Sequence, residues 1–148
     1  MIVVIQRCSQ ATVLIKNKVF SKIDNGLVIF LGIKKGDHIN DADKIIDKVI
    51  NMRIFNDNNN KMNLSAIDIE SDIMVVSQFT LYGNIKKGRR PSFIDAENPD
   101  IAKKLYNYFI DKIKAKGFFV RTGKFRETMS IDLINDGPVT FILDSRDI

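Results

Sequence analysis

The 148-residue chain has one cysteine, one histidine, three prolines and no tryptophan. The single cysteine, Cys8, excludes an intramolecular disulfide, which agrees with a reducing compartment. A zinc site of the usual cysteine and histidine type is excluded as well, because such a site needs several of these ligands. No apolar run approaches the roughly 20 residues that a membrane-spanning helix needs. The N-terminal residues do not have the form of a secretory signal. We therefore predict a cytoplasmic protein without membrane segments.

The usual side-chain nucleophiles and bases are also scarce. His38 lies in a polar segment before a predicted helix, and we interpret it as a solvated loop or cap residue. Cys8 ends the first predicted strand and is typical of a packing thiol. No Walker-type loop and no GxGxxG pattern is present. An enzyme with this sequence would have to use backbone groups, a bound water or functional groups of its substrate.

The charged residues comprise 23 Lys and Arg against 18 Asp and Glu, which gives a net charge of +5. A basic balance suits a polyanionic partner, although the heavy use of Lys, Ile and Asn throughout the chain weakens this inference. The length favours one domain covering residues 1–148. The hydrophobic fraction of 45% is ordinary for a globular protein.

Short runs rich in β-branched residues dominate the chain and predict strands. The Asn25-Gly26 pair predicts a hairpin turn, because both residue types accept positive φ angles. The Asn-rich segment 56–61 predicts a surface turn. The predicted strands are Ile2–Gln6, Thr12–Lys16, Val19–Ile23, Leu27–Ile33, Ile73–Phe79, Phe118–Arg121, Ser130–Ile134 and Val139–Leu143.

Two segments have apolar residues at helical spacing, one from Asp41 to about Phe55 and one from Pro99 to Lys116. Asn40 or Asp41 can cap the first helix, and Pro99 suits the first turn of the second. Together with the strands, these helices predict an α+β fold, with a small β-barrel-like antiparallel sheet and two main helices packed outside.

One polar motif, Ser77-Gln78-Phe79-Thr80, directly follows an apolar predicted strand. A strand end can direct hydroxyl, amide and backbone N–H groups into a pocket, although an ordinary strand-to-loop transition has the same composition. A second motif surrounds Gly137-Pro138 between two predicted strands. It predicts a β-turn, and an X-Pro bond at such a place can be cis at a modest cost in free energy.

In combination, these two motifs resemble those of the D-aminoacyl-tRNA deacylase family. Further segments that resemble the family are Val4–Arg7, Asp41–Lys44, Arg53–Phe55, Lys61–Ser65 and Gly88–Phe93, so the resemblance extends over essentially the whole chain. One segment departs from the family pattern. Arg126-Glu127 stands where the family often has small residues, and this change affects the expected rim of the pocket.

The resemblance implies a homodimer that hydrolyses the ester of D-aminoacyl-tRNA, and of mischarged glycyl-tRNA, at two sites in the subunit interface. It also implies that these sites need no metal and no organic cofactor. The segment from Ser77 to Thr80 of one subunit would face the Gly137-Pro138 segment of the other. Backbone N–H groups at Phe79 and Thr80 would stabilise the oxyanion. The Thr80 hydroxyl would assist or, as older family models had it, act as the nucleophile. The 2′-hydroxyl of the terminal adenosine would help to activate water.

Selectivity is also implied by the resemblance. A cis peptide bond between Gly137 and Pro138 would present carbonyl groups that crowd the α-carbon of an L-amino acid. Arg7 would support this segment, and Met129 would line the pocket. The densest basic cluster would contact the tRNA phosphates; it consists of Lys86, Lys87, Arg89 and Arg90.

Two other functions are compatible with the sequence. One is a related deacylase that edits an L- or achiral aminoacyl-tRNA, for which a trans Gly-Pro bond is expected. The other is a non-catalytic nucleic-acid-binding module, as in family members with an added tail. The intact motifs around Thr80 and Pro138, and the end of this chain at Ile148, favour the catalytic interpretation.

Overall fold

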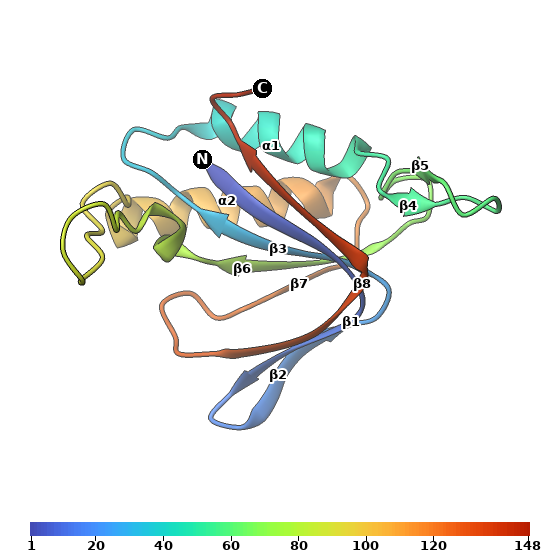
Figure 1. Ribbon diagram of the computed structural model, residues 1–148, viewed down its shortest axis with the longest axis horizontal. Coiled ribbons are helices and arrows are strands. Elements are labelled where there is room, and N and C mark those ends of the chain that lie inside the picture. Colours follow the sequence, from blue (N-terminus) through green and yellow to red (C-terminus); the bar gives the residue numbers. More distant parts are fainter.

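A computed structural model describes all residues from 1 to 148 as a strongly curled sheet with two helices on one side (Figure 1). The central strand is β1 (Ile2–Ile15). Its first half pairs with β3 (Gly26–Gly32) and its second half with β2 (Lys18–Ile23). The long strand β8 (Ser130–Asp144) runs antiparallel to β1 along its whole length. Four predicted strands therefore merge into two long ones.

The remaining strands join the sheet in parallel. β6 (Asp72–Ser77) is parallel to β3, and β7 (Val120–Thr122) is parallel to β6. The predicted α+β class, the barrel-like sheet and the two outer helices are confirmed, but the expectation of a purely antiparallel sheet is wrong. The reason is that α1 (Ile39–Asn51) and α2 (Pro99–Ala115) connect successive strands and return the chain to the same end of the sheet.

The sheet curls until β2 lies beside β7, where the Ser21 hydroxyl donates a hydrogen bond to the Thr122 carbonyl at 2.7 Å. A small hairpin of β4 (Phe55–Asn56) and β5 (Met62–Leu64) extends from the end of α1. The Asn-rich segment forms the turn of this hairpin, as predicted. The short 3-10 helix η1 (Phe79–Tyr82) follows β6 directly.

The predicted hairpin at Asn25-Gly26 is wrong. β2 and β3 do not pair with each other, because both pair with β1. The tight turn lies instead between β1 and β2, where Lys16 and Asn17 have φ angles of 50° and 61°. Gly26 serves another purpose, since a Cβ there would lie 2.0 Å from the carbonyl oxygen of Asp72 on the neighbouring strand. The glycine permits a close approach of two strands.

Both helices occur where their periodicity predicts them. α1 begins slightly before Asp41 and ends at Asn51, before the predicted end near Phe55. Its N-cap is His38, whose N–H donates to the Asp41 carboxylate at 2.9 Å, so Asp41 lies inside the first turn. Asn98 caps α2 by accepting a hydrogen bond from the N–H of Asp100. Neither helix is long and apolar enough to cross a membrane.

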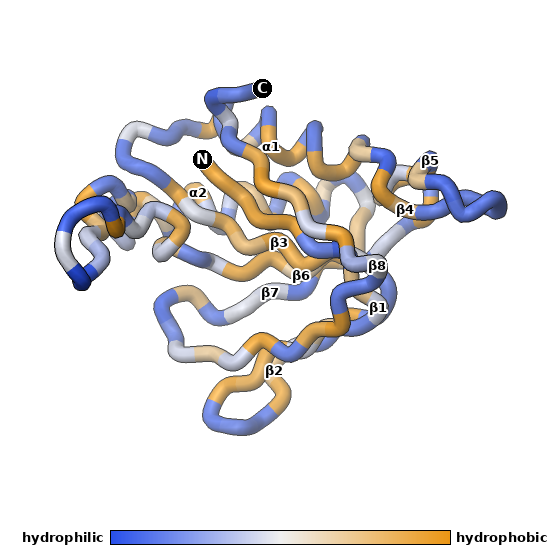
Figure 2. Tube along the Cα trace, in the orientation of Figure 1, coloured by the Kyte–Doolittle hydropathy of each residue, from blue (hydrophilic) through white to orange (hydrophobic).

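Apolar side chains form two cores, one between the sheet and the helices and one inside the barrel. Figure 2 shows the corresponding hydrophobic colouring along the strands and the inner sides of the helices. The larger core includes Val3, Ile5, Ile29, Val75, Ile46 and Phe109. The smaller one includes Cys8, Ala11, Val13, Val28, Met74 and Val76. Strand residues alternate between the two cores, which makes β3 and β6 rigid supports for the segments at their ends.

Candidate active site

The first motif begins at the carboxyl end of β6. The buried strand ends at Ser77, and the N–H of Gln78 donates to the Leu31 carbonyl of β3 at 2.8 Å. The chain then turns into η1, where the Phe79 side chain is 55% exposed and Thr80 is exposed as well. The rigid sheet thus presents a short polar segment to solvent.

The groups of this segment are suited to binding an oxyanion. The first N–H groups of a helical turn have no carbonyl partner within that turn, and at η1 these belong to Phe79 and Thr80. The Gln78 side-chain amide donates a hydrogen bond to the Thr80 hydroxyl. An amide cannot accept the hydroxyl proton through its nitrogen, so this contact orients the Thr80 oxygen and does not activate it as a nucleophile.

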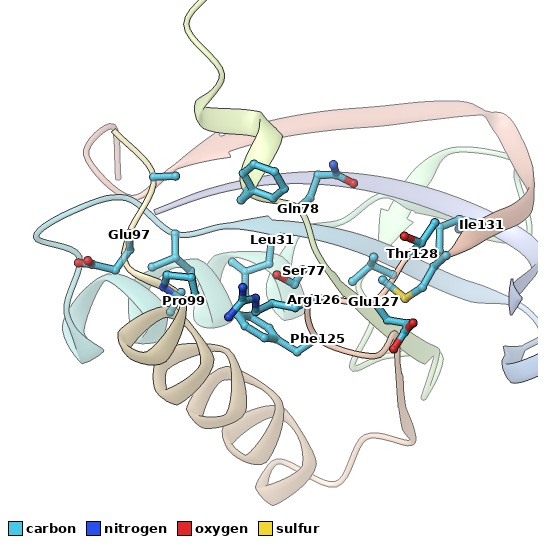
Figure 3. Close-up of a pocket in the computed structure, with 16 residues that line it drawn as sticks. Leu31, Ser77, Gln78, Glu97, Pro99, Phe125, Arg126, Glu127, Thr128 and Ile131 are labelled. Atoms are coloured by element: carbon cyan, nitrogen blue, oxygen red, sulfur yellow. The ribbon is translucent and has the colours of Figure 1, made fainter. Parts of the chain in front are cut away.

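A cavity of about 610 Å³ opens beside Ser77, Gln78 and Phe79 (Figure 3). Met129 lies in its wall, and its sulfur accepts a hydrogen bond from the N–H of Lys124 at 3.1 Å. The other residues around the cavity come from β3 and β6, from in and around the start of α2, and from the start of β8 and the segment before it. They are Leu31, Ile33, Val76, Ala96, Glu97, Pro99, Ala102, Phe125, Arg126, Glu127, Thr128 and Ile131.

The second motif interrupts β8 where its register against β1 shifts. The Gly137-Pro138 peptide bond is cis, as predicted, and Gly137 has a φ angle of 137°. Both residues are exposed. The expected turn between two separate strands is therefore an irregular segment within one continuous strand.

Arg7 holds this segment from the inside of the protein. Its side chain is 4% exposed, and its Nε atom donates to the carbonyl of Asp136 at 3.0 Å. Its Nη1 atom donates to the carbonyl of Ile54 at 2.7 Å. A Cβ on Gly137 would lie 3.1 Å from Nη2 of Arg7. The guanidinium therefore connects the Gly-Pro segment to the short link between α1 and β4.

Asn135 also holds the segment, a role that the sequence analysis did not assign. Its side-chain oxygen accepts the N–H of Val139 at 2.7 Å, and its Nδ2 atom donates to the Val139 carbonyl at 3.2 Å. The same Nδ2 atom also donates a hydrogen bond to the Thr140 hydroxyl, which accepts a second one from the Gln6 side chain. The signal in the sequence was an Asn two residues before Gly-Pro, since Asn side chains bond to nearby backbone.

The two motifs do not meet within one chain. Ser77 is aligned with Val3 across the sheet, whereas Arg7 lies four residues farther along β1. This offset corresponds to about 13 Å along the strand direction. Arg7 and Asp136 line a separate cavity of about 270 Å³. The cavity at Ser77 therefore contains no group from the Gly-Pro segment of its own chain.

The basic cluster lies in the loop between η1 and α2. Its members, Lys86, Lys87, Arg89 and Arg90, are all exposed. The loop is fixed at its base by paired hydrogen bonds between Asn84 and Ser92, at 2.7 and 2.9 Å. Next to this pair, the Phe93 ring packs edge-on against Phe79 with a centroid distance of 4.9 Å. The basic loop is thus in direct contact with the segment that carries the N–H groups.

Cys8 and His38 lie outside this site. Burial raises the pKa of the Cys8 thiol to about 11, so it is protonated at neutral pH and is a poor nucleophile. Its side chain is completely buried in the smaller core. His38 is exposed at the start of α1. No three His, Cys, Asp or Glu side chains are grouped as metal ligands.

Comparisons with known proteins agree with this geometry. A family model described as D-Tyr-tRNA(Tyr) deacylase matches residues 4–144. A D-aminoacyl-tRNA deacylase of Thermodesulfovibrio yellowstonii is 52% identical over 146 residues, covering 99% of this chain and 100% of the relative. One of Aquifex aeolicus is 51% identical over 145 residues, covering 98% of both.

Solved structures show the same fold. A c-Myc DNA unwinding element binding protein is 33% identical and superimposes with a TM-score of 0.91, covering 97% of this chain and 98% of its own. A structure described as a probable eukaryotic D-amino acid tRNA deacylase is 18% identical, with a TM-score of 0.82 and the same coverage.

Proposed function

Since the chain belongs to the D-Tyr-tRNA(Tyr) deacylase family, a family of hydrolases that act on the aminoacyl-tRNA ester, we propose that it removes D-amino acids from tRNA in the cytoplasm and spares L-amino acids. The observation that carries this proposal is the pair of exposed, rigidly held motifs at Phe79-Thr80 and Gly137-Pro138. The first motif carries backbone N–H groups that can stabilise the oxyanion formed in ester hydrolysis. The second carries exposed backbone carbonyls that can select between substrates at the α-carbon.

The hydrolysis needs only a modest catalyst, because an aminoacyl ester is an activated bond. Water adds to the carbonyl carbon, and the negative charge on the carbonyl oxygen is stabilised by the N–H groups of Phe79 and Thr80. A fixed donor of this kind contributes about 3 kcal/mol to transition-state stabilisation. The tetrahedral intermediate then releases the amino acid, and the ribose oxygen of the tRNA receives a proton. The adjacent 2′-hydroxyl of the substrate assists the attack of water.

Selection relies on the backbone of the Gly137-Pro138 segment. A filter that accepts many side chains has to contact the groups common to all amino acids, namely the α-carbon and the amino group. Exposed backbone carbonyls can accept hydrogen bonds from the amino group of a D-amino acid and crowd the side chain of an L-amino acid. Arg7 and Asn135 keep the segment in one position. Glycine has no side chain, so glycyl-tRNA should be hydrolysed as well.

A homodimer completes the site. The two motifs lie apart in one chain, so the Gly-Pro segment of a partner has to enter the cavity beside Ser77. The free edge of β8 supports this arrangement, because β8 pairs only with β1. Exposed apolar side chains follow this strand, with Ile134 at 59%, Phe141 at 38% and Ile142 at 68%. Such an edge is an aggregation hazard unless another chain covers it.

The basic loop provides the contact to the tRNA body. None of its four cations forms an ion pair within the chain, so all are available for phosphates. Contacts of this kind position an RNA without reading its sequence. The contact between Phe93 and Phe79 would then place the 3′ end of the tRNA beside the N–H groups of η1.

A comparison of D-Tyr-tRNA, L-Tyr-tRNA and Gly-tRNA in one deacylation assay tests the proposal. We expect release of tyrosine from the D ester and of glycine, and no enzyme-dependent release from the L ester. Equal rates with D- and L-Tyr-tRNA would exclude selection at the α-carbon and would favour a deacylase without chiral preference, whereas faster hydrolysis of the L ester would favour one of opposite preference.

DNA binding is the second candidate, because one solved relative is described as a DNA unwinding element binding protein. The exposed basic loop suits any nucleic acid backbone. Binding of duplex DNA that is as tight as that of tRNA at the same salt concentration, without any ester hydrolysis, would favour this function.

A further inference from the structure

Arg126 is the one charged residue of the cavity whose side chain has no partner. Three charged residues line the cavity. The Glu127 carboxylate pairs with the Lys124 ammonium at 3.2 Å. The Glu97 carboxylate accepts hydrogen bonds from the N–H groups of Asn98 at 2.6 Å and Gly36 at 3.3 Å. The guanidinium of Arg126 is therefore available to a ligand.

The backbone at Arg126 is unusual for an arginine. Its φ angle is 63°, in the left-handed region that glycine and asparagine favour. It is the third residue of a turn that the hydrogen bond from the Glu127 N–H to the Lys124 carbonyl closes, at 3.2 Å. A long charged side chain has no conformational advantage at this position, so the backbone does not account for its presence.

The turn fixes the position from which the side chain extends. The Phe125 ring packs against Tyr106 with a centroid distance of 5.5 Å, and Tyr106 donates to the Val75 carbonyl of β6 at 2.8 Å. On the other side, the N–H of Lys124 binds the sulfur of Met129. Figure 3 shows the Arg126 guanidinium directed into the cavity, beside Phe125 and Pro99 and below Ser77.

We propose that Arg126 forms an anion-binding subsite of the cavity, separate from the N–H groups of Phe79 and Thr80. Its guanidinium would bind a phosphate or a carboxylate of the substrate. The planar guanidinium donates parallel hydrogen bonds that match two oxygens of a phosphate or a carboxylate. The inference rests on the proposed function, since the substrate then enters beside Ser77. Two parts of an aminoacyl-tRNA can provide the oxyanion: the phosphate of the terminal nucleotide and the side-chain carboxylate of D-aspartate or D-glutamate.

Three variants separate charge from backbone conformation. Arg126→Asn removes the charge and retains a residue that tolerates the left-handed region. Arg126→Gly removes both charge and strain, and Arg126→Lys retains the charge without the planar donor pair. Arg121→Ala is the matched control, because Arg121 is exposed and lies over the Phe119 ring outside the cavity.

The variants are assayed with D-Asp-tRNA, D-Asn-tRNA, D-Tyr-tRNA and D-tyrosyl-adenosine, which has neither a phosphate nor a carboxylate side chain. We expect Arg126→Asn and Arg126→Gly to lower kcat/KM about tenfold, mainly through KM, with the substrate that provides the oxyanion. A loss with D-Asp-tRNA that D-Asn-tRNA does not show assigns the carboxylate. An equal loss with all three tRNA esters, and none with D-tyrosyl-adenosine, assigns the phosphate.

Two results would overturn the subsite. One is unchanged kcat/KM for all four substrates in both uncharged variants. The other is an equal loss with D-tyrosyl-adenosine, which would indicate a general effect on the cavity. The wild-type protein in the same series tests the proposed function separately: if it hydrolyses none of the four esters, the proposed function fails, whereas normal wild-type rates with unaffected variants reject only the role of Arg126.

Discussion

The Nε atom of Arg7 lies 3.0 Å from the carbonyl oxygen of Asp136, the residue immediately before the Gly137-Pro138 segment. The same guanidinium binds the carbonyl of Ile54, so one buried side chain links β1, the segment between α1 and β4, and the segment proposed to select the substrate. Lysine cannot reproduce this fork, because its donors diverge from a single nitrogen.

The Arg7→Lys variant should therefore fold but discriminate less between D- and L-aminoacyl-tRNA. We expect the ratio of D-Tyr-tRNA to L-Tyr-tRNA hydrolysis to fall at least about tenfold, or ~1.4 kcal/mol, because the Gly-Pro segment loses one of its two anchors. Circular dichroism and the urea midpoint should show a folded protein. Arg121→Lys serves as a control and should leave the ratio unchanged. A ratio that stays at the wild-type value in a folded Arg7→Lys variant would contradict the positioning role.

Two inactive variants should restore activity when their subunits are mixed. Phe79→Pro removes a backbone N–H of the first motif, and Gly137→Val obstructs the second motif. Each homodimer should be inactive. A heterodimer formed by denaturing and refolding the mixture should contain one intact site. We expect roughly one quarter of the wild-type activity, from one site in half of the dimers at random assortment. Activity that stays at background despite proven heterodimers would place both motifs in the same chain's site.

Removing the two conventional nucleophiles should have little effect on catalysis. The double variant Cys8→Ala/His38→Ala should retain activity within about tenfold, because neither side chain lies in the cavity at Ser77. Incubation with EDTA should also leave the rate unchanged. A thousandfold loss in a folded double variant would show that one of these groups takes part in the reaction.

Alkaline pH should destabilise the protein partly through Cys8. The thiol pKa is raised from 9.0 to about 11 by burial, so the folded state retains the proton more tightly than the unfolded state. The associated stability is fully present below pH 9 and is lost as the pH rises through about 11. Urea unfolding at several pH values should therefore show a steeper decline between pH 9 and 11 for the wild type than for Cys8→Ala. Parallel curves would indicate that folding does not raise the pKa of the Cys8 thiol.

Salt should weaken tRNA binding through the basic loop. Each phosphate that a cation neutralises releases counterions, so the logarithm of the binding constant falls with the logarithm of the salt concentration. Replacing Lys86, Lys87, Arg89 and Arg90 with alanine should flatten this dependence. Replacing four exposed lysines in and directly after α2 with alanine provides a control of equal net charge; they are Lys103, Lys104, Lys114 and Lys116. An unaltered slope in the loop variant would exclude the loop as the tRNA contact.

Local patterns were sufficient to predict the parts of the fold that depend on neighbouring residues. The helical stripe from Pro99 and the apolar strand before Ser77 both lie where the sequence indicates. The parallel pairing of β6 was not predictable in this way, because it depends on how two helices return the chain. Asn25-Gly26 was misleading for a related reason, since the two strands that it connects, β2 and β3, pair one after the other with β1 and not with each other.

The candidate site was predictable to a similar extent. Family resemblance assigned Thr80, Met129 and Gly137-Pro138, but Asn135 was missed because its bonds to Val139 appear only once β8 bends. Arg126 was noted as a departure from the family pattern. Its lack of a partner depends on the contacts of two neighbouring carboxylates. The bond from the Gly36 N–H to Glu97 joins distant segments, whereas the ion pair of Glu127 with Lys124 is local.

The pairing of β1 with β8 also has a consequence for how the protein is made. These two strands form the longest ladder of the sheet, yet almost the whole chain lies between them. Contacts at such sequence separation form slowly, because a large loop has to be closed before they contribute. On the ribosome, one edge of β1 therefore remains without its partner until β8 emerges. We expect the nascent chain to be a client of chaperones and premature termination before β8 to yield an aggregating product.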